Sequence, residues 1–211
     1  KDEPQHVTQG RVMTAMLDAM EVPWEVLPAH EESAVECLSR VHDRAIDHGG
    51  PVAVLVEQGI FEPYDPPAVE VPDLPTRENA VEIMTDVVAD DALIVSTTGM
   101  LSRELFEARE RAGQDGSTDF LTVGGMGHAS AIALGVALAE PDREVWCFDG
   151  DGALLMHAGT LATIGDRGPA NFYHAVFNNG VHDSVGGQPT SIDHVDVPAL
   201  ARRSTRAGTT T

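Results

Sequence analysis

Short runs of consecutive apolar residues alternate along the chain with longer stretches whose apolar positions recur at helical spacing. The runs predict buried strands, and they lie at 92–96, 120–123, 145–148 and 172–177. The helical stretches are predicted to begin at the N-caps Thr76 and Ser102 and to cover 128–138 and 153–164. This alternating order predicts an α/β fold: a doubly wound, mostly parallel sheet in three layers.

The first 57 residues repeat this alternation on a smaller scale. Helical spacing covers 12–20 and 34–45, and strand-like runs lie at 24–27 and 51–56. An acidic stretch with five prolines then spans 58–75, which is typical of an extended linker between domains. The sequence therefore predicts two regions, 1–57 and 76–211, joined by that linker.

Two polar motifs follow neighbouring predicted strands of the second region. Gly150-Asp151-Gly152 comes after the run at 145–148, and Asn178-Asn179 comes directly after the run at 172–177. The 25 residues between the motifs contain the helical stretch at 153–164 and then the run at 172–177, so the two strands should be parallel, adjacent and connected in the right-handed sense. Both motifs should then lie at carboxyl strand ends, where open α/β sheets bind ligands.

The residue types in these motifs indicate a metal and a phosphate. Asp151 offers a carboxylate oxygen and Asn179 an amide oxygen, and Mg²⁺ prefers oxygen ligands beside substrate phosphates. Gly150 and Gly152 leave backbone N–H groups open to a phosphate at the start of the crossover segment. We therefore predict a diphosphate bridged to the protein by Mg²⁺.

Composition excludes several classes of protein. The formal net charge is −21, from 34 acidic and 13 basic residues, so a nucleic-acid partner, which needs a basic surface, is not expected. The sequence shows neither a run of 18 apolar residues nor a signal-peptide pattern, so we expect no membrane partner and a cytoplasmic location. Cys37 and Cys147 lie in apolar surroundings and are expected to be buried thiols rather than a disulfide.

Gly-Asp-Gly followed after about two dozen residues by Asn-Asn resembles the thiamine diphosphate signature. Within that superfamily the chain resembles the phosphonopyruvate and sulfopyruvate decarboxylases over about residues 1–190. The resemblance lies in Lys1–His6, Gly59–Tyr64, Ser96–Gly99, Ser102–Leu105, Gly125–Ala129 and Asn178–Thr190. It implies the thiamine diphosphate-binding fold and a lyase that uses thiamine diphosphate and Mg²⁺.

The resemblance also assigns site residues. It implies Mg²⁺ ligation by Asp151, Asn179 and the Val181 carbonyl, and it makes Met126 an apolar wedge between the two cofactor rings, with the Gly124 carbonyl facing the aminopyrimidine. The expected cofactor-binding set is Thr97, Thr98, Gly124, Met126, Gly150, Asp151, Gly152, Ala153, Asn179 and Val181. The Thr97 and Thr98 hydroxyls could donate to diphosphate oxygens or belong to a helix-capping turn.

Four residues are candidates for contact with the reacting groups: His128, Met126, His182 and Ser184. His128 could hydrogen-bond substrate or exchange protons near neutral pH, or it could be a capped or a core histidine. His182 and Ser184, with Asp183 and Gln188, could close over substrate or diphosphate or be a solvated loop. Family members commonly have a lysine after Thr-Thr-Gly, where this chain has Met100. A sulfonate carries less charge than a fully ionised phosphonate and so needs fewer cations, which makes this position a possible determinant of substrate.

The expected reaction is decarboxylation of a three-carbon α-keto acid bearing a phosphonate or sulfonate, giving the corresponding acetaldehyde and CO₂. Residues 1–57 resemble the end of a pyrimidine-binding domain without its glutamate, and 202–211 depart from the family. We therefore expect a homo-oligomer, or a partner chain that supplies the pyrimidine-binding domain. The alternatives are a decarboxylase of an ordinary α-keto acid, a cofactor-binding but catalytically incomplete fragment, and an unrelated nucleotide-binding domain, which would lack support from a GxGxxG or P-loop pattern.

Overall fold

The computed structural model describes residues 6–63 and 74–205, and it divides the chain into two compact units, Lys1–Glu70 and Val71–Thr211. The division falls inside the predicted linker 58–75. Lys1–Gln5 and Tyr64, on which parts of the sequence resemblance rest, lie outside the described residues, as do most of the linker and residues 206–211. Each unit is described by itself.

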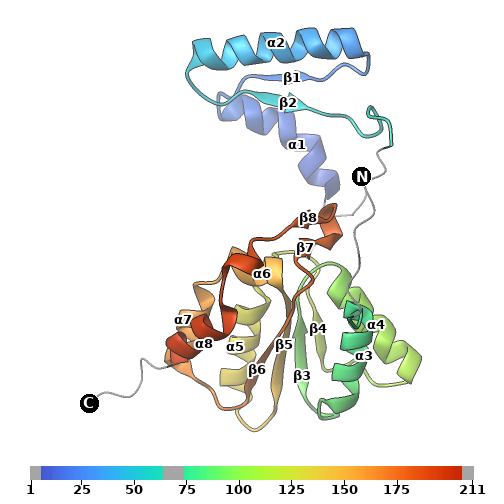
Figure 1. Cartoon of the computed structure of the whole chain (residues 1–211), viewed down its shortest axis with the longest axis vertical. Coiled ribbons are helices and arrows are strands. Elements are labelled where there is room, and N and C mark those ends of the chain that lie inside the picture. The colour runs from blue at the N-terminus through green and yellow to red at the C-terminus, as the bar shows by residue number, and fades with distance from the viewer. Residues whose placement is uncertain (1–5, 64–73, 206–211) are drawn as a thin grey trace. The chain divides into compact units, whose positions relative to one another are not determined.

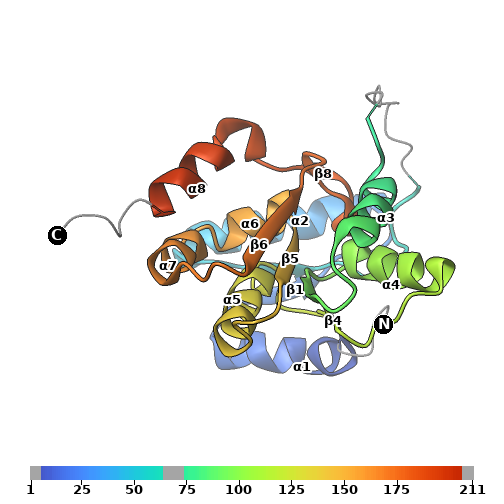
Figure 2. The same ribbon diagram turned by 90° about the horizontal axis from the view of Figure 1, so that it is seen from below.

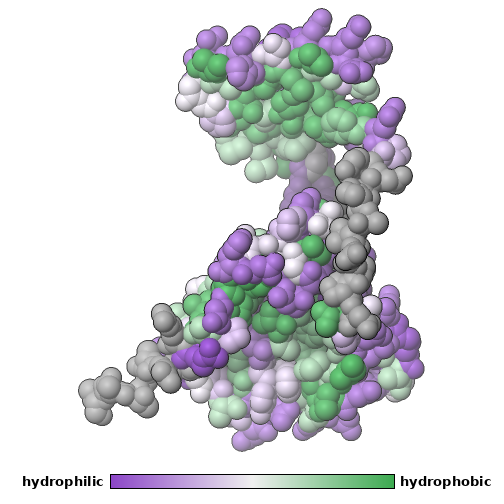
Figure 3. Space-filling view, in the orientation of Figure 1, coloured by the Kyte–Doolittle hydropathy of each residue, from purple (hydrophilic) through white to green (hydrophobic). Residues whose placement is uncertain are grey.

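Unit 1 is a small parallel α/β layer. It contains α1 (His6–Ala19), β1 (Trp24–Val26), α2 (Glu31–His48) and β2 (Ala53–Leu55), close to the four predicted elements. β1 and β2 pair in parallel. Leu27, Cys37 and Val41 form a buried cluster where α2 covers these strands. Figure 3 shows hydrophobic residues over the strands and hydrophilic residues over α2. α1 has no buried residue, and its apolar side chains Val7, Met13 and Met16 are exposed.

Unit 2 is the doubly wound domain that the sequence predicts (Figure 1). Its sheet has the order β4-β3-β5-β6 and every pairing is parallel. The strands are β3 (Leu93–Ser96), β4 (Asp119–Leu121), β5 (Val145–Gly150) and β6 (Phe172–Phe177). The principal helices are α3 (Arg77–Val87), α4 (Met100–Ala112), α5 (Ala129–Ala139), α7 (Thr160–Arg167) and α8 (Val197–Thr205).

Alternating side chains of the strands fill two separate cores. Ile94 and Phe148 pack with α3 and α4 on one face of the sheet, and Val95 and Cys147 pack with α5 on the other. Figure 2 shows helices on both sides of the strands. Because both faces are covered, β3 and β5 consist almost entirely of buried residues, which is why they read as continuous apolar runs.

Each unit contains one of the chain's two tryptophans. Trp24 lies on β1, where its indole N–H donates to Asp18 at 2.9 Å. Trp146 lies on β5 opposite Tyr173 of β6, and the two rings stack with centroids 4.6 Å apart.

Thr76 caps α3 as predicted, but two other helix predictions were wrong. The Thr76 hydroxyl accepts the Asn79 N–H at 3.2 Å. Ser102 is not a cap: α4 begins at Met100 behind Gly99, whose φ of 94° suits only glycine. The stretch between the two polar motifs is also two helices, α6 (Asp151–Met156) and α7, because a turn at 157–159 breaks it.

No helix in the described part of the chain is both long and apolar enough to cross a membrane.

Candidate active site

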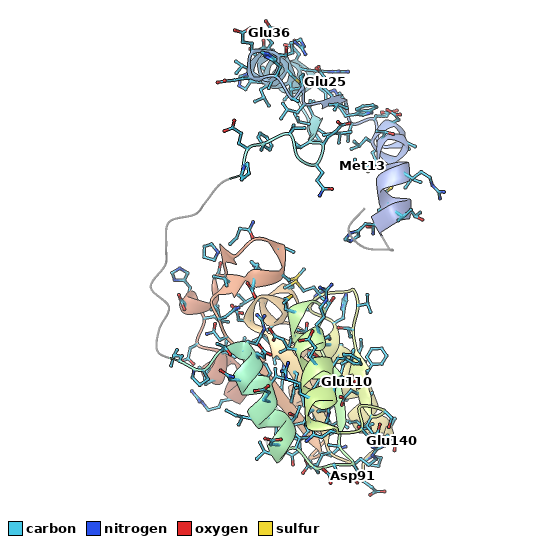
Figure 4. The ribbon with its side chains drawn as sticks, turned by 90° about the vertical axis from the view of Figure 1, so that its right-hand side faces the viewer. Met13, Glu25, Glu36, Asp91, Glu110 and Glu140 are labelled. Atoms are coloured by element: carbon cyan, nitrogen blue, oxygen red, sulfur yellow. The ribbon has the colours of Figure 1, made fainter. Side chains whose placement is uncertain are left out.

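β3 and β5 are neighbours in the sheet, but the chain leaves them in opposite directions. After β3 it continues to β4 on one side, and after β5 it continues to β6 on the other. The carboxyl ends of these strands therefore flank a topological switch point, where open α/β sheets bind ligands. Asp91, Glu110 and Glu140 lie toward the opposite end of unit 2, where the strands begin (Figure 4), so these three acidic groups lie away from the switch point.

A hollow opens at this switch point, and most of the predicted site residues line it. They are Thr97, Thr98, Met126, Gly150, Asp151, Gly152, Ala153, Asn179, Val181, His182 and Ser184. Gly124 and His128 are not among its lining residues. Met100, the position at which the family commonly has lysine, does line it.

The two predicted side-chain metal ligands meet at this hollow from different strands. Asp151 begins α6 directly after β5 and is only 2% exposed. Its Oδ2 accepts the Thr190 hydroxyl at 2.5 Å. Asn179 follows β6, and its Oδ1 accepts the Val181 N–H at 3.2 Å, which turns the backbone so that Val181 also lines the hollow.

Thr97 and Thr98 differ in what their hydroxyls can do. The Thr97 Oγ1 is buried and has no hydrogen-bond partner among the described residues. The backbone around it is fixed by the Thr97 N–H, which donates to the Phe148 carbonyl (2.8 Å), and by the Ser102 hydroxyl, which donates to the Thr97 carbonyl (2.6 Å). A buried polar atom left unpaired is costly, so Thr97 is suited to donate to a ligand oxygen. The Thr98 hydroxyl already donates to the Val123 carbonyl at 2.7 Å, so it has no proton left for a diphosphate in this arrangement.

Gly152 allows a close approach that a larger residue would block. A Cβ there would lie 2.5 Å from Cε1 of His182 and 3.4 Å from the Met126 methyl. The imidazole of His182 and the thioether of Met126 therefore reach the hollow over a glycine backbone. A real Cβ is essentially never this close to another atom, so the His182 ring would have to move if residue 152 carried a side chain.

His128 lies outside the hollow, in a pair with another histidine. It precedes α5 without a side-chain capping bond, and its ring lies 4.3 Å from that of His157. The structure thus brings Met126, His182 and Ser184 to the hollow. His128 is exposed, so it is not a core histidine, and its contact with the reacting groups stays a prediction.

Arg77 is a lining residue that the sequence reasoning missed. Its guanidinium donates to both carboxylate oxygens of Glu104 (2.7 and 2.8 Å) and to Asp183 (3.0 Å). The hydrogen bond that Arg77 donates to Glu104 contributes most to raising the pKa of Arg77, which burial opposes. Arg77 and Asp183 lie 106 positions apart, and no local motif signals a pairing over that distance. The contact ties the segment after Asn179 to α3 and α4.

A second polar cluster lies within the sheet behind the hollow. Cys147, Asp149 and His174 place their ligating atoms within 4.8 Å of one another. The Asp149 carboxylate accepts the Gly150 N–H at 3.0 Å and lies 3.2 Å from His174 Nε2, which gives this fully buried acid two partners. Burial, reinforced by Asp149, raises the pKa of the Cys147 thiol well above its ordinary value. The expectation of two free, buried cysteines is confirmed.

The donor set fits a Mg²⁺-bound diphosphate. One buried carboxylate and one amide oxygen converge, as Mg²⁺ binding to a phosphorylated ligand requires. The unpaired Thr97 hydroxyl supplies a donor at the same hollow.

Comparison with known proteins agrees with this reading. Residues 97–205, more than half of the chain, match the model of the thiamine pyrophosphate enzyme family, C-terminal TPP binding domain. A solved structure from Mycobacterium smegmatis, assigned to the thiamin diphosphate-dependent enzymes, superimposes with a TM-score of 0.50 over 77% of this chain and 35% of that one, at 21% identity. This likeness supports the fold.

Two kinds of curated relatives are more similar in sequence. Phosphonopyruvate decarboxylase of Streptomyces viridochromogenes is 37% identical over 95% of this chain and 53% of its own length. Sulfopyruvate decarboxylase subunit beta of Methanothermobacter thermautotrophicus is 37% identical over 59% of this chain and 64% of its own length. The chain thus spans about half the length of the phosphonopyruvate decarboxylases it matches. It belongs to the thiamine pyrophosphate enzyme family, which confirms the predicted family, fold class and cofactor.

Proposed function

We propose that this chain forms the diphosphate-binding part of a decarboxylase that acts on a three-carbon α-keto acid with a phosphonate or sulfonate group. The products would be the corresponding acetaldehyde and CO₂. The observation that carries the proposal is the convergence of Asp151, Asn179 and the unpaired Thr97 hydroxyl at the switch point of unit 2. The two kinds of relatives, which bear the names of such decarboxylases, support the substrate class.

Several residues that line the hollow have a specific role in this proposal. Asp151, Asn179 and the Val181 carbonyl would hold Mg²⁺, and Thr97 would donate to a diphosphate oxygen. When bound, thiamine diphosphate supplies the electron sink for loss of CO₂. Met126 would contact the cofactor through its polarisable thioether, and His182, held over Gly152, would offer its imidazole to the substrate or to a moving proton. Ser184, whose side chain lies near Gly99, would help to close the hollow over the substrate.

The charge of the hollow bears on which acid is used. Arg77 is already paired with Glu104 and Asp183, so its charge is offset before substrate arrives. Met100 adds no charge where the family commonly has lysine. A sulfonate, with one negative charge, suits this environment better than a fully ionised phosphonate. Met100→Lys should raise kcat/KM for 3-phosphonopyruvate relative to 3-sulfopyruvate, and an unchanged preference would contradict this assignment.

The remaining parts of the working enzyme belong to the same proposal. Unit 1 would be the end of a pyrimidine-binding domain, and the activating glutamate would come from another subunit or from a partner chain. One relative is named as a subunit beta, which fits an enzyme assembled from more than one chain. A cytoplasmic location fits a small, anionic, soluble substrate.

Release of CO₂ from 3-phosphonopyruvate, 3-sulfopyruvate and pyruvate, with thiamine diphosphate and Mg²⁺, tests the proposal. Release from one of the first two acids supports it, whereas a preference for pyruvate would favour an ordinary α-keto acid decarboxylase. If the chain binds the cofactor but releases no CO₂, hydrogen–deuterium exchange at thiamine C2 decides whether it can activate the cofactor. Absence of cofactor binding, with calorimetry against NAD and ATP as comparison, would refute the proposal.

A further inference from the structure

The carboxylate of Asp151 is held from one side by a threonine 39 positions away. The Thr190 hydroxyl donates to Oδ2 at 2.5 Å. Among the described residues no hydrogen bond reaches Oδ1, the other oxygen of this carboxylate. Since Asp151 is 2% exposed and lines the hollow, a single neutral donor fixes the rotation of a buried acid.

Thr190 is itself fixed by the backbone that follows Asn179. Its N–H donates to the Gly180 carbonyl at 2.8 Å, which closes residues 180–190 into a loop. Inside this loop β7 (Val181–His182) pairs with β8 (Gln188–Pro189), and the Gly187 N–H donates to the His182 carbonyl at 3.0 Å. Thr190 therefore joins the end of β5, through Asp151, to the segment that follows β6.

We propose that Thr190 is a positioning residue for the metal. Its hydroxyl occupies Oδ2 of Asp151 and leaves Oδ1 to face the cation, while its backbone holds loop 180–190 so that Asn179 and the Val181 carbonyl reach the same point. This inference rests on the proposed function, because it takes Mg²⁺ with a diphosphate as the ligand. Outer-sphere hydrogen bonds of this type orient metal-binding carboxylates and tune their affinity.

A general loss of packing has to be distinguished from a loss of metal positioning. Thr85 provides the control, since its hydroxyl also donates a hydrogen bond, to the Glu82 carbonyl at 2.8 Å. Thr85 is more deeply buried than the half-buried Thr190, and it lies on α3 and does not line the hollow. Thr85→Val and Thr190→Val remove the same hydroxyl group, and Thr190→Ser keeps the donor.

The experiment measures Mg²⁺ affinity at saturating thiamine diphosphate in the full chain and its three variants. We expect Thr190→Val to weaken Mg²⁺ binding by about 10- to 100-fold, Thr190→Ser to restore most of the affinity, and Thr85→Val to leave it unchanged. In the metal-free chain, amide hydrogen exchange at Gly187 and Thr190 should accelerate in Thr190→Val and not in Thr85→Val.

The outcomes separate this inference from the proposed function. Equal Mg²⁺ affinity for wild type and Thr190→Val would overturn the inference, even if loop exchange accelerated, since Thr190 would then only close the loop. Equal weakening by Thr85→Val would overturn it too, because the effect would be general destabilisation. A wild-type chain that binds no thiamine diphosphate with Mg²⁺ would refute the proposed function, and the exchange measurement would still decide whether the Thr190 bond holds the loop.

Discussion

The two units use the same alternation of helix and strand with different results. Unit 2 covers both faces of a four-stranded sheet and fills a core on each. The described residues of unit 1 form two strands, one buried cluster and a helix, α1, with no buried residue. The candidate site lies on unit 2, where strand ends are held by packing on both sides and side chains can converge without further ordering. The difference shows that apolar periodicity predicts elements, whereas the number of covered faces decides how rigidly those elements hold a site.

The prediction with the largest expected effect removes a buried aromatic ring from the core of unit 2. Phe148 is fully buried just before Asp149 and contacts Phe177, so Phe148→Ala should cost about 3–5 kcal/mol of unfolding free energy and weaken cofactor binding. Leu27→Ala, in the smaller cluster of unit 1, is the matched variant. Denaturant unfolding followed by circular dichroism measures the loss of unfolding free energy in each variant. If both variants lost the same free energy in one shared transition, the two units would form one cooperative structure and the comparison would fail.

Adding a single methyl group tests how tightly each unit is packed. Gly152→Ala forces a Cβ to within 2.5 Å of His182, so we expect a loss of about 1–3 kcal/mol together with weaker binding of thiamine diphosphate. Gly10→Ala, inside α1, meets nothing within 4 Å and should stabilise unit 1 by about 0.5–1 kcal/mol. Thermal unfolding measures the change in stability of each variant, and calorimetric titration measures the affinity for thiamine diphosphate. Similar tolerance at both glycines would contradict the difference in packing.

The two buried thiols report how often each unit opens. Burial raises the pKa of both Cys37 and Cys147, so the folded protein holds less thiolate than a free cysteine at the same pH, and labelling has to wait for opening. The open chain titrates with an ordinary thiol pKa of about 8.5, so labelling should accelerate as the pH rises from 7 to 9. Mass spectrometry should find Cys37 modified at least about tenfold faster than Cys147, because we expect unit 1 to open more often. Faster labelling of Cys147 would show that unit 2 opens more often.

The smallest expected effect concerns hydrogen bonds at different depths. Ser102→Ala removes a buried bond to the Thr97 carbonyl in unit 2 and should cost about 0.5–1.5 kcal/mol. Asp18→Ala removes an exposed bond from Trp24 in unit 1, and we expect no measurable change in stability. Urea unfolding of the two variants side by side checks this. An equal cost at both positions would mean that depth of burial does not separate the units.

The sequence predicted the strands and the meeting of Asp151 with Asn179 because both depend on local patterns and one topological rule. It was wrong for Ser102, since a serine is compatible with a cap and with a helix interior, and only the position of Gly99 decides between them. The contacts of Arg77 and Thr190 were beyond reach, because they join residues 106 and 39 positions apart. The hydroxyl directions of Thr97 and Thr98 also depend on neighbours that no local pattern contains.

The stacking of Trp146 on Tyr173 has an optical consequence. The two rings span β5 and β6, the strands that precede Asp151 and Asn179. Emission from Trp146 is therefore sensitive to the spacing of those strands, while Trp24 emits from the other unit. Replacing Trp24 with phenylalanine would leave Trp146 as the one tryptophan of the chain. Tryptophan fluorescence could then report on the spacing of the two strands beneath the site without an attached dye.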